Sequence, residues 1–324
     1  MRRFLSVLAI CALLVSCRFA DDIVSGGNPF STARDLIKGM VVTGVVDNKV
    51  LIAYESGISY SGEHWQEGEF VEFPLVTDVH IGMEDTDNVI QHEEDFIAFI
   101  KGKDYPFAVC LGDIVDDGEF YDSRVIDFIT RSAAEVNGNF VEAVGNHDRR
   151  EHSQSTIDKF LSEFNGGRIE KMVFDQLSLY KLDNSLRTYG KDQLKYLEDA
   201  LEDDDNPCKL ILAHENLIAG TDFDMTLFYT GTGDIAERNR LLRIMKENGA
   251  GLILTGHTHT GNKAVKVTST LAEFNAASCI EEEQGNGRGY CYTVRVSFTD
   301  KVVTITAFDV ATGDQKDIYS FNLP

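Results

Sequence analysis

The sequence predicts a domain of the α/β (α+β) class. Five short apolar runs are rich in Val, Ile, Leu and Phe, as strands buried on both faces are. Segments with helical periodicity alternate with these runs, and such alternation is typical of α/β folds. The five runs are Val71–Thr77, Phe107–Leu111, Phe140–Val144, Lys209–Ala213 and Gly251–Thr255.

Three helices are predicted between these strands. Two of them are amphipathic, because their apolar residues recur on one helical face. A third begins at Asp234, which forms a capping-box pattern with Glu237, and it ends at Asn248-Gly249. The apolar faces consist of Ile157, Phe160, Leu161 and Phe164 in the first helix and of Leu194, Leu197 and Leu201 in the second.

Strands without helices are predicted on both sides of this region. Residues 40–73 alternate β-branched residues with turn residues and indicate a few short strands. After residue 264 the pattern indicates strands alone, with two longer ones at Tyr290–Phe298 and Val302–Phe308. Because no linker-like composition follows Met40, one domain is predicted for residues 39–324.

The N-terminal residues have the pattern of an export signal. Arg2 and Arg3 precede an apolar run, Phe4–Val15, that is too short to remain as a membrane-spanning anchor. The run ends in Leu14-Val15-Ser16-Cys17, which resembles the bacterial lipobox. We therefore expect residues 1–16 to be a lipoprotein signal peptide and residues 17–38 a linker attached to a lipid on Cys17. The alternative is an ordinary cleaved signal peptide with an incidental cysteine.

Both interpretations predict export, and the first predicts a lipoprotein anchored on the periplasmic side of a membrane or on the cell surface. Without residues 1–16 the chain has 28 basic and 53 acidic residues, a formal net charge of −25. Such a surface repels nucleic acids at long range and argues against them as partners. A cleft lined by metal ions can still be locally positive. Nothing in the sequence indicates an oligomeric state.

Four cysteines lie beyond the export signal, at positions 110, 208, 279 and 291. Cys110 lies inside a predicted buried strand and is interpreted as core packing. Cys279 and Cys291 flank a loop rich in Glu and Gly, so either a disulfide closes this loop or both thiols stay free. None of the spacings resembles a cysteine zinc site.

Side chains that bind metals follow each of the five predicted buried strands. Five of the eight histidines in the chain lie in these segments, a clustering that chance does not explain. In α/β folds this edge of the sheet is where ligands bind. The segments are Asp78-Val79-His80, Gly112-Asp113, Gly145-Asn146-His147-Asp148, His214 and Gly256-His257-Thr258-His259.

The spacing of these residues favours a metal centre. In an extended segment residues i and i+2 point the same way, so Asp78 with His80, and His257 with His259, can face one cleft. Glycines 112, 145 and 256 permit close approach of the backbone. Mixed carboxylate and imidazole ligands suit Mn, Fe or Zn. Seven candidate ligands are too many for one tetrahedral site, and two divalent ions about 3.5–4 Å apart would accommodate them.

In this order the motifs D-x-H, G-D, G-N-H-D, H and G-H-x-H resemble those of the calcineurin-like metallophosphoesterase family. The resemblance covers roughly residues 71–260 and includes Leu182-Asp-Asn184 and Gly190-Lys-Asp-Gln-Leu194. It implies a four-layer α-β-β-α sandwich of two mixed sheets flanked by helices. The metal site would lie at the carboxyl ends of the strands.

The resemblance also implies hydrolysis of a small phosphorylated substrate, a phosphodiester or a phosphomonoester, by a hydroxide that bridges the metals. His147 would stay off the metals and protonate the leaving group. Asp148 could orient the His147 imidazole or cap the next helix. In this assignment the first metal is held by Asp78, His80 and His259, the second by Asn146, His214 and His257, and both by Asp113.

Purple acid phosphatases of this family carry a tyrosine where this chain has Asp116, which argues against a purple Fe(III) enzyme. Two alternatives from other classes are a catalytically inactive lipoprotein that uses the fold as a binding surface, and a metal-scavenging lipoprotein. The complete ligand set argues against the first, and the absence of His-rich tracts argues against the second.

Other residues near the motifs have simpler interpretations. Arg149 and Arg150 could contact phosphate, although a solvated basic pair explains them equally. Three histidines without a motif, His64, His92 and His152, are expected at the surface, with His152 a candidate for the rim of the cleft. Substrate choice is expected to depend on the loops at Ile81–Asn88 and Ile218–Gly233.

Overall fold

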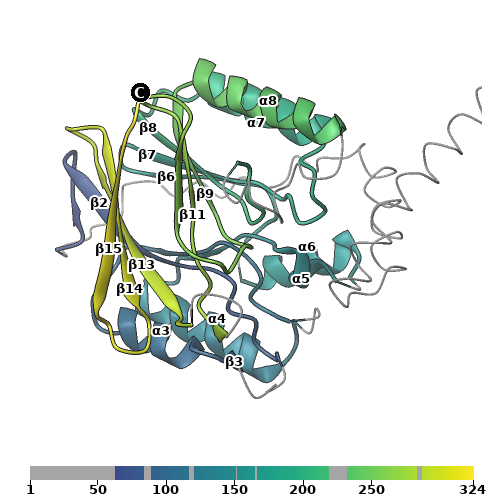
Figure 1. Cartoon of the computed structure of the whole chain (residues 1–324), viewed down its shortest axis with the longest axis vertical. Helices are drawn as coiled ribbons and strands as arrows, with labels where there is room; N and C mark the ends of the chain where they lie inside the picture. The colour runs from purple at the N-terminus through teal and green to yellow at the C-terminus, as the bar shows by residue number, and fades with distance from the viewer. Residues whose placement is uncertain are drawn as a thin grey trace, which may run out of the picture. The chain divides into compact units, whose positions relative to one another are not determined.

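Two β-sheets packed face to face form the centre of the computed structural model (Figure 1). The structure describes residues 63–83, 89–116, 120–150, 152–164, 166–218, 232–282 and 287–324, without the side chains of 232–235. All of these residues belong to one structural unit, Val46–Pro324. The signal peptide, the linker and the strands expected before residue 63 lie outside the described residues.

The first sheet has the strand order β15-β14-β13-β2-β4-β5, and β1 pairs with β2. Strands β2, β4 and β5 are parallel to one another, whereas β13, β14 and β15 form an antiparallel half. The strand bounds are Trp65–Gln66 for β1, Phe70–Val76 for β2, Ala108–Cys110 for β4, Phe140–Glu142 for β5, Tyr290–Ser297 for β13, Val302–Asp309 for β14 and Gln315–Asn322 for β15.

The second sheet has the order β10-β11-β9-β8-β7-β6. Its four inner strands are parallel, and the two edge strands pair antiparallel to their neighbours. A separate two-stranded ladder joins β3 (Val89–Ile90) to β12 (Glu281–Glu282). The bounds in the second sheet are Glu170–Phe174 for β6, Leu177–Lys181 for β7, Cys208–Leu212 for β8, Ala250–Thr255 for β9, Lys263–Lys266 for β10 and Ala272–Asn275 for β11.

The six described helices cover the outer faces of the two sheets (Figure 1). One apolar cluster joins Cys110 in β4 to Phe96, Phe128 and Phe160, so α3, α4 and α6 lie on the first sheet. Another cluster joins the second sheet to α7 and α8. The helix bounds are Glu93–Ile100 for α3, Ser123–Glu135 for α4, Asn146–Arg149 for α5, Gln154–Glu163 for α6, Lys191–Glu202 for α7 and Thr232–Glu247 for α8.

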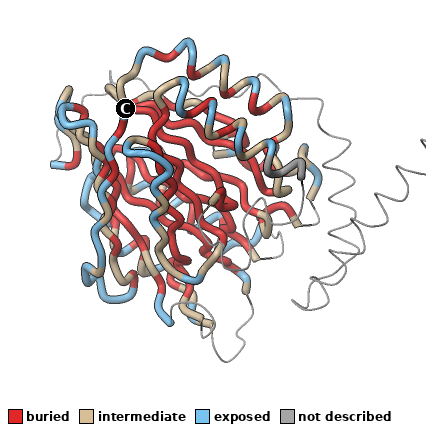
Figure 2. Tube along the Cα trace, turned by 45° about the horizontal axis from the view of Figure 1, so that its top comes forward, coloured by how far each residue is buried: buried red, intermediate tan, exposed pale blue. Residues whose placement is uncertain are grey.

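Several strands, namely β4, β5, β7, β8, β9 and β11, are buried along their whole length, so both faces of the sheets are covered there (Figure 2). In β2, the side chains of Val71, Phe73 and Leu75 enter the core between the sheets, whereas Val76 faces the helices. Apolar residues are needed on both faces, which is why the strands read as continuous apolar runs. The four-layer α-β-β-α arrangement is therefore confirmed, with helix, sheet, sheet and helix in succession.

The strands predicted after residue 264 are present, and they include β15, a largely exposed edge strand in which Phe321 is the buried apolar residue. Two local predictions were wrong. Helix α8 begins at Thr232, so Asp234 lies inside it, and the Glu237 carboxylate instead accepts hydrogen bonds from the N–H groups of Tyr189 and Gly190. His64 and His92, expected at the surface, are both buried.

The four cysteines within the described residues are free thiols. Cys279 and Cys291 are both buried in the cluster between the first sheet and its helices, so no disulfide closes the loop between them. Cys110 lies in the same cluster, as predicted. Within the described part of the chain, no helix combines the length and the apolar character needed to cross a membrane.

A buried carboxyl, Glu142 at the end of β5, makes the stability of the protein depend on pH. Burial raises the pKa of Glu142 to about 8, although the charge of nearby Lys181 lowers it. The Nζ atom of Lys181 forms an ion pair with Glu170 at 2.6 Å, so it offsets the burial of Glu142 only in part. Between about pH 4.5 and pH 8 the folded chain therefore holds a proton on Glu142 that the unfolded chain does not hold, and stability falls as the pH rises through this window.

Replacing Glu142 by Gln is expected to remove this pH dependence. Relative to the unchanged protein, the free energy of unfolding of the variant should rise across the window by up to about 1.4 kcal/mol per pH unit and level off above pH 8. Urea unfolding of both proteins between pH 5 and pH 9 measures the difference. A difference that stays constant over this range would show that Glu142 is ionised throughout.

Candidate metal centre

Two loops of the first sheet lie side by side and carry the first candidate ligands. After β2, the N–H groups of Asp78 and His80 donate to the carbonyl oxygens of Gly112 and Asp113, each at 3.0 Å. These hydrogen bonds hold the Asp78-Val79-His80 segment against the loop that follows β4. Val79 between them is fully buried and packs in the core, which anchors the segment.

Five of the seven candidate ligands have backbone torsions in the left-handed region. The φ angles are 53° for Asp78, 48° for His80, 49° for Asp113, 76° for His257 and 54° for His259. The prediction that these pairs lie in extended segments was therefore wrong. Non-glycine residues adopt this conformation at a cost of about 1–3 kcal/mol each, and such strain concentrates at functional sites.

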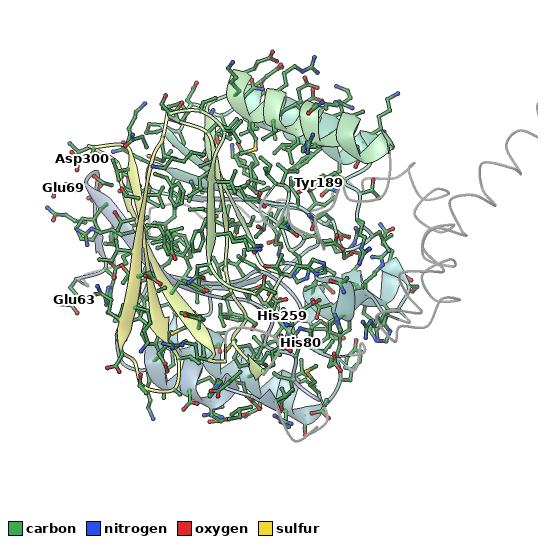
Figure 3. The ribbon with its side chains drawn as sticks, in the orientation of Figure 1. Glu63, Glu69, His80, Tyr189, His259 and Asp300 are labelled. Carbon is green, nitrogen blue, oxygen red and sulfur yellow. The ribbon has the colours of Figure 1, made fainter. Side chains whose placement is uncertain are left out.

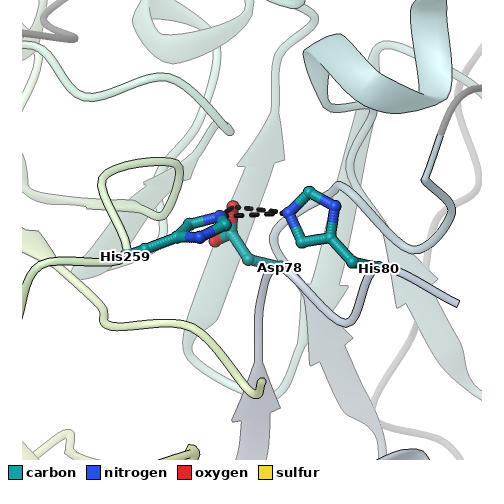
Figure 4. Close-up of side chains that lie close together, drawn as sticks. All are labelled: Asp78, His80 and His259. Atoms are coloured by element: carbon teal, nitrogen blue, oxygen red, sulfur yellow. Dashed lines mark hydrogen bonds and ion pairs between the residues drawn. The ribbon is translucent and has the colours of Figure 1, made fainter. Parts of the chain in front are cut away.

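The second sheet contributes the facing ligands. His80 and His259 come from loops of different sheets and lie close together (Figure 3). Nε2 of His80 is 3.0 Å from Nε2 of His259, which is 3.1 Å from Oδ1 of Asp78 (Figure 4). These three side chains form one group whose nitrogen and oxygen atoms converge on a common point.

A second group forms around His214, which follows β8. Its Nε2 atom lies 3.1 Å from Oδ2 of Asp113 and 3.1 Å from Oδ1 of Asn146, the first residue of α5. His257 belongs to the same group, with its ring 5.1 Å from that of His214. Asp113 also reaches the first group, because its Oδ2 atom is 3.8 Å from Nε2 of His80.

All three motif glycines are required by close packing at this point: a Cβ atom on Gly112, whose φ is 103°, would lie 2.7 Å from the backbone nitrogen of Gly145, and the contacts at the other two glycines are shorter still. A Cβ atom on Gly145 would lie 2.0 Å from Oδ1 of Asp113, and one on Gly256 would lie 2.0 Å from Oγ1 of Thr77. Both contacts are much shorter than any real side chain allows. The glycines therefore let the loops from the two sheets approach until the ligands meet.

The donor atoms of the site fit cations. Within the described residues, Nε2 of His257 is buried and has no hydrogen-bond partner, and Oδ2 of Asp113 makes no well-aligned hydrogen bond although it lies 3.1 Å from Nε2 of His214. Buried polar atoms rarely lack a hydrogen-bond partner, and a bound metal ion is one of the few explanations for such an atom. Together with Asp78 and the other imidazoles, these atoms form two groups of the composition that Mn, Fe or Zn binds.

The electrostatics of the site also favour positive charge. Burial alone would lower the pKa of His214 and of His259, but the adjacent Asp113 and Asp78 raise both pKa values to about 10. The same pairs lower the pKa of the two carboxyl groups, against the effect of their burial. The carboxylates thus stay ionised and attract cations to both groups.

A further layer of contacts orients the candidate ligands. Nδ1 of His259 lies 2.7 Å from Oε1 of Glu282 in β12, and Nδ1 of His214 lies 2.9 Å from the carbonyl oxygen of Leu111. Thr77 donates to Asp78 over 2.6 Å. Such contacts fix which ring nitrogen faces a metal. These contacts are not predictable from the sequence, because no motif marks Glu282 or Thr77.

His147 lies beside the first group, and with His80 and Asp116 it forms a third, overlapping group of potential metal-binding atoms. Its ring is 4.6 Å from that of His80, and its Nδ1 atom is 2.7 Å from Oδ1 of Asp116. Asp116 also contacts Nδ1 of His80 at 3.3 Å. Nη2 of Arg150 lies 3.2 Å from Nε2 of His147. Because a guanidinium group only donates, this nitrogen of His147 is the acceptor in that contact.

The suggestion that Asp148 orients His147 was wrong. The Asp148 carboxylate accepts hydrogen bonds from the N–H groups of Gly145, Asp113 and Val115, so it caps its own helix and joins the loops after β4 and β5. Asp116 occupies the position next to His147 instead. Arg149 is buried, and its Nη1 atom lies 3.8 Å from Oδ2 of Asp183.

Other predicted positions have no direct part in the site. His152 packs on the ring of Phe120, with a centroid distance of 5.3 Å. The loops expected to select the substrate lie largely outside the described residues. Two buried polar residues in β11 were not predicted to matter. The Glu273 carboxylate accepts from the N–H of Leu217 and from the hydroxyl of Thr255. The Asn275 amide donates to the hydroxyl of Thr255 and to the carbonyl oxygen of Gly256.

The four-layer fold and the converging metal-binding side chains define a metal-dependent hydrolase of phosphoesters. The sequence model of the calcineurin-like phosphoesterase family matches residues 73–261, more than half of the chain. The protein therefore belongs to the calcineurin-like phosphoesterase family. No curated protein matches the sequence.

Solved structures with the same fold include both enzymes and a protein with another role. A dimetal phosphatase from Danio rerio is 11% identical with a TM-score of 0.57, and the match covers 80% of this chain and 100% of that one. A purple acid phosphatase from yellow lupin (Lupinus luteus) seeds is 12% identical with a TM-score of 0.54, covering 79% of this chain and 55% of the lupin chain. This chain thus spans about half the length of the lupin enzyme. GAP50, described as the anchor in the inner membrane complex of Plasmodium, is 12% identical with a TM-score of 0.54, and the match covers 79% and 90% of the two chains.

Proposed function

We propose that the protein hydrolyses phosphate esters at a centre of two divalent ions, with a water or hydroxide between them as the nucleophile. The observation that carries this proposal is the convergence of two ligand groups that share Asp113. Asp78, His80 and His259 would hold one ion, and Asn146, His214 and His257 the other. Bound there, the ions would lower the pKa of the water and offset charge on the phosphoryl oxygens.

The residues of the chain supply the remaining parts of the mechanism. Glu282 and the carbonyl oxygen of Leu111 hold His259 and His214 with their Nε2 atoms toward the centre. His147 would donate a proton from Nε2 to the departing alkoxide, while Asp116 stabilises the imidazole at Nδ1. Nε2 of His147 accepts from Arg150 in this structure, so Arg150 would have to move aside and Nε2 would have to take up a proton from water before this step.

An ester panel combined with metal analysis tests this function. Purified protein should contain about two Mn, Fe or Zn ions per chain and should hydrolyse at least one class of phosphomonoester or phosphodiester. Removal of the metal with a chelator should abolish turnover, and adding it back should restore turnover. Failure to hydrolyse any ester after reloading with each of the three metals would contradict the proposal.

A binding role without catalysis is the alternative, and the similarity to GAP50 shows that the fold is compatible with it. The complete set of candidate ligands supports the enzyme instead. A protein that binds no metal and retains a specific partner would favour the alternative.

We also propose that the protein is exported and anchored by a lipid on Cys17, on the periplasmic side of a membrane or on the cell surface. The lipobox-like end of the apolar run supports this proposal. Mass spectrometry of the mature N-terminus should find an acylated Cys17. Replacing Cys17 by Ser should move the protein from the membrane fraction to the soluble fraction.

A further inference from the structure

The loop between β7 and α7 is fixed to the turn that carries His214. Asn184 makes the connection: its Oδ1 atom accepts from the N–H groups of His214 at 3.1 Å and Glu215 at 3.0 Å. Its Nδ2 atom donates to the carbonyl oxygen of Glu215 at 2.8 Å and to the hydroxyl of Tyr189 at 3.1 Å. All four contacts are buried, so the loop has a defined position beside the second ligand group.

Arg187 lies in this loop, and its side chain contacts Glu215, the residue after His214. Its backbone has a φ of 60°, and its N–H donates to the carbonyl oxygen of Asn184 at 2.8 Å. Its Nε atom lies 3.5 Å from Oε1 of Glu215, which is fully buried next to His214. A left-handed arginine is uncommon, and here the loop maintains it without a glycine.

The guanidinium group of Arg187 has N–H donors that its contact with Glu215 does not use. Among the described residues, Glu215 is the carboxylate within ion-pair distance, and it meets the Nε side of the group. Four further N–H bonds belong to the two terminal nitrogens. The side chain is 38% exposed, so these donors are accessible. The guanidinium group also lies within electrostatic range of the His257 ring.

We propose that Arg187 binds a phosphoryl oxygen of the substrate on the side of His214 and His257, and so favours phosphomonoesters over phosphodiesters. This inference rests on the proposed function. A monoester carries two negative charges on the phosphoryl group at neutral pH and a diester carries one. A planar guanidinium fork matches phosphate oxygens in charge and geometry. His147 lies beside His80 and the first group, so the leaving group and Arg187 would not compete for space.

Binding of inorganic phosphate by the metal-loaded protein tests the role of Arg187 directly. Calorimetric titration should show that Arg187→Ala weakens phosphate binding about 10- to 100-fold, the loss expected for charge-assisted hydrogen bonds, at unchanged metal content. Arg187→Lys should recover part of the affinity, because it keeps the charge and loses the fork. Arg243→Ala is the matched control, since Arg243 is exposed on α8 and pairs with Glu198; it should bind phosphate as the unchanged protein does.

Activity measurements then test the substrate class. With p-nitrophenyl phosphate and bis(p-nitrophenyl) phosphate, Arg187→Ala should raise KM for the monoester and reduce the monoester-to-diester ratio of kcat/KM about tenfold. An unchanged ratio, or an unchanged affinity for phosphate, would overturn the inference.

A purely structural Arg187 gives a different result. If it only neutralises Glu215, Arg187→Ala should lower the melting temperature and the metal content, the double variant with Glu215→Gln should restore both, and phosphate affinity per loaded site should not change. That result would overturn the inference. If the unchanged protein hydrolyses no ester, the proposed function fails, and the phosphate titration still decides whether Arg187 binds phosphate.

Discussion

Replacing Asp113 by Asn is expected to reduce kcat by at least about 10³-fold and to remove about one metal ion per chain. Oδ2 of Asp113 faces both ligand groups, at 3.1 Å from Nε2 of His214 and 3.8 Å from Nε2 of His80. Asparagine has the same shape but lacks the negative charge that two neighbouring cations require. The variant should still fold, because Oδ1, which accepts from the N–H of His147, is preserved as an amide oxygen.

Asp127→Asn is the matched control for this substitution. Asp127 is half-exposed on α4 and pairs with Arg131, so the same chemical change there should leave activity and metal content unaltered. Metal analysis and steady-state kinetics on both variants measure the effect. An Asp113→Asn protein with two metals and full activity would exclude Asp113 as the residue shared by the two ions.

Replacing His147 by Ala is expected to leave both metals bound and to lower kcat by about 10²- to 10⁴-fold, the range of general acid catalysis. His147 lies beside His80 but is a ligand of neither proposed ion, which is why the metals should remain. The alternative set that His147 forms with His80 and Asp116 predicts loss of metal from the same variant. The loss should be largest for alkyl esters, because an alkoxide needs a proton to depart. It should be small for p-nitrophenyl esters, whose leaving group is stable as an anion.

Asp116→Asn separates positioning from catalysis in the same experiment. Asp116 lies 2.7 Å from Nδ1 of His147 and 3.3 Å from Nδ1 of His80, so its substitution should give a smaller loss with the same dependence on the leaving group. Kinetics over a series of esters with graded leaving groups measure this dependence. Equal losses for good and poor leaving groups would rule out His147 as the acid.

The sequence was sufficient to predict the fold and the residues that meet at the site. Strands buried on both faces must be apolar throughout, so β2, β4, β5, β8 and β9 stand out as apolar runs. The carboxyl ends of parallel strands share one edge of a sheet, so the polar residues after each run identify a common location. The residue pattern did not indicate that these five strands belong to two facing sheets. The two-sheet arrangement was expected only from the family resemblance.

The contacts that orient the ligands were not predictable in the same way. Glu282 meets His259 only because β12 pairs with β3, and two-residue strands leave no recognisable pattern. Arg187 contacts Glu215 from a left-handed loop position, which no propensity favours. Asp116 stands where purple acid phosphatases have a tyrosine, and that comparison gave no reason to expect its contact with His147. The contact depends on how the loops after β4 and β5 pack.

The most direct test of the central claim is an anomalous difference map from crystals of the Mn-loaded protein. We predict two peaks about 3.5–4 Å apart, one among Asp78, His80 and His259 and the other among Asn146, His214 and His257, with Asp113 between them. A single peak, or a map without peaks at these residues, would contradict a two-metal centre.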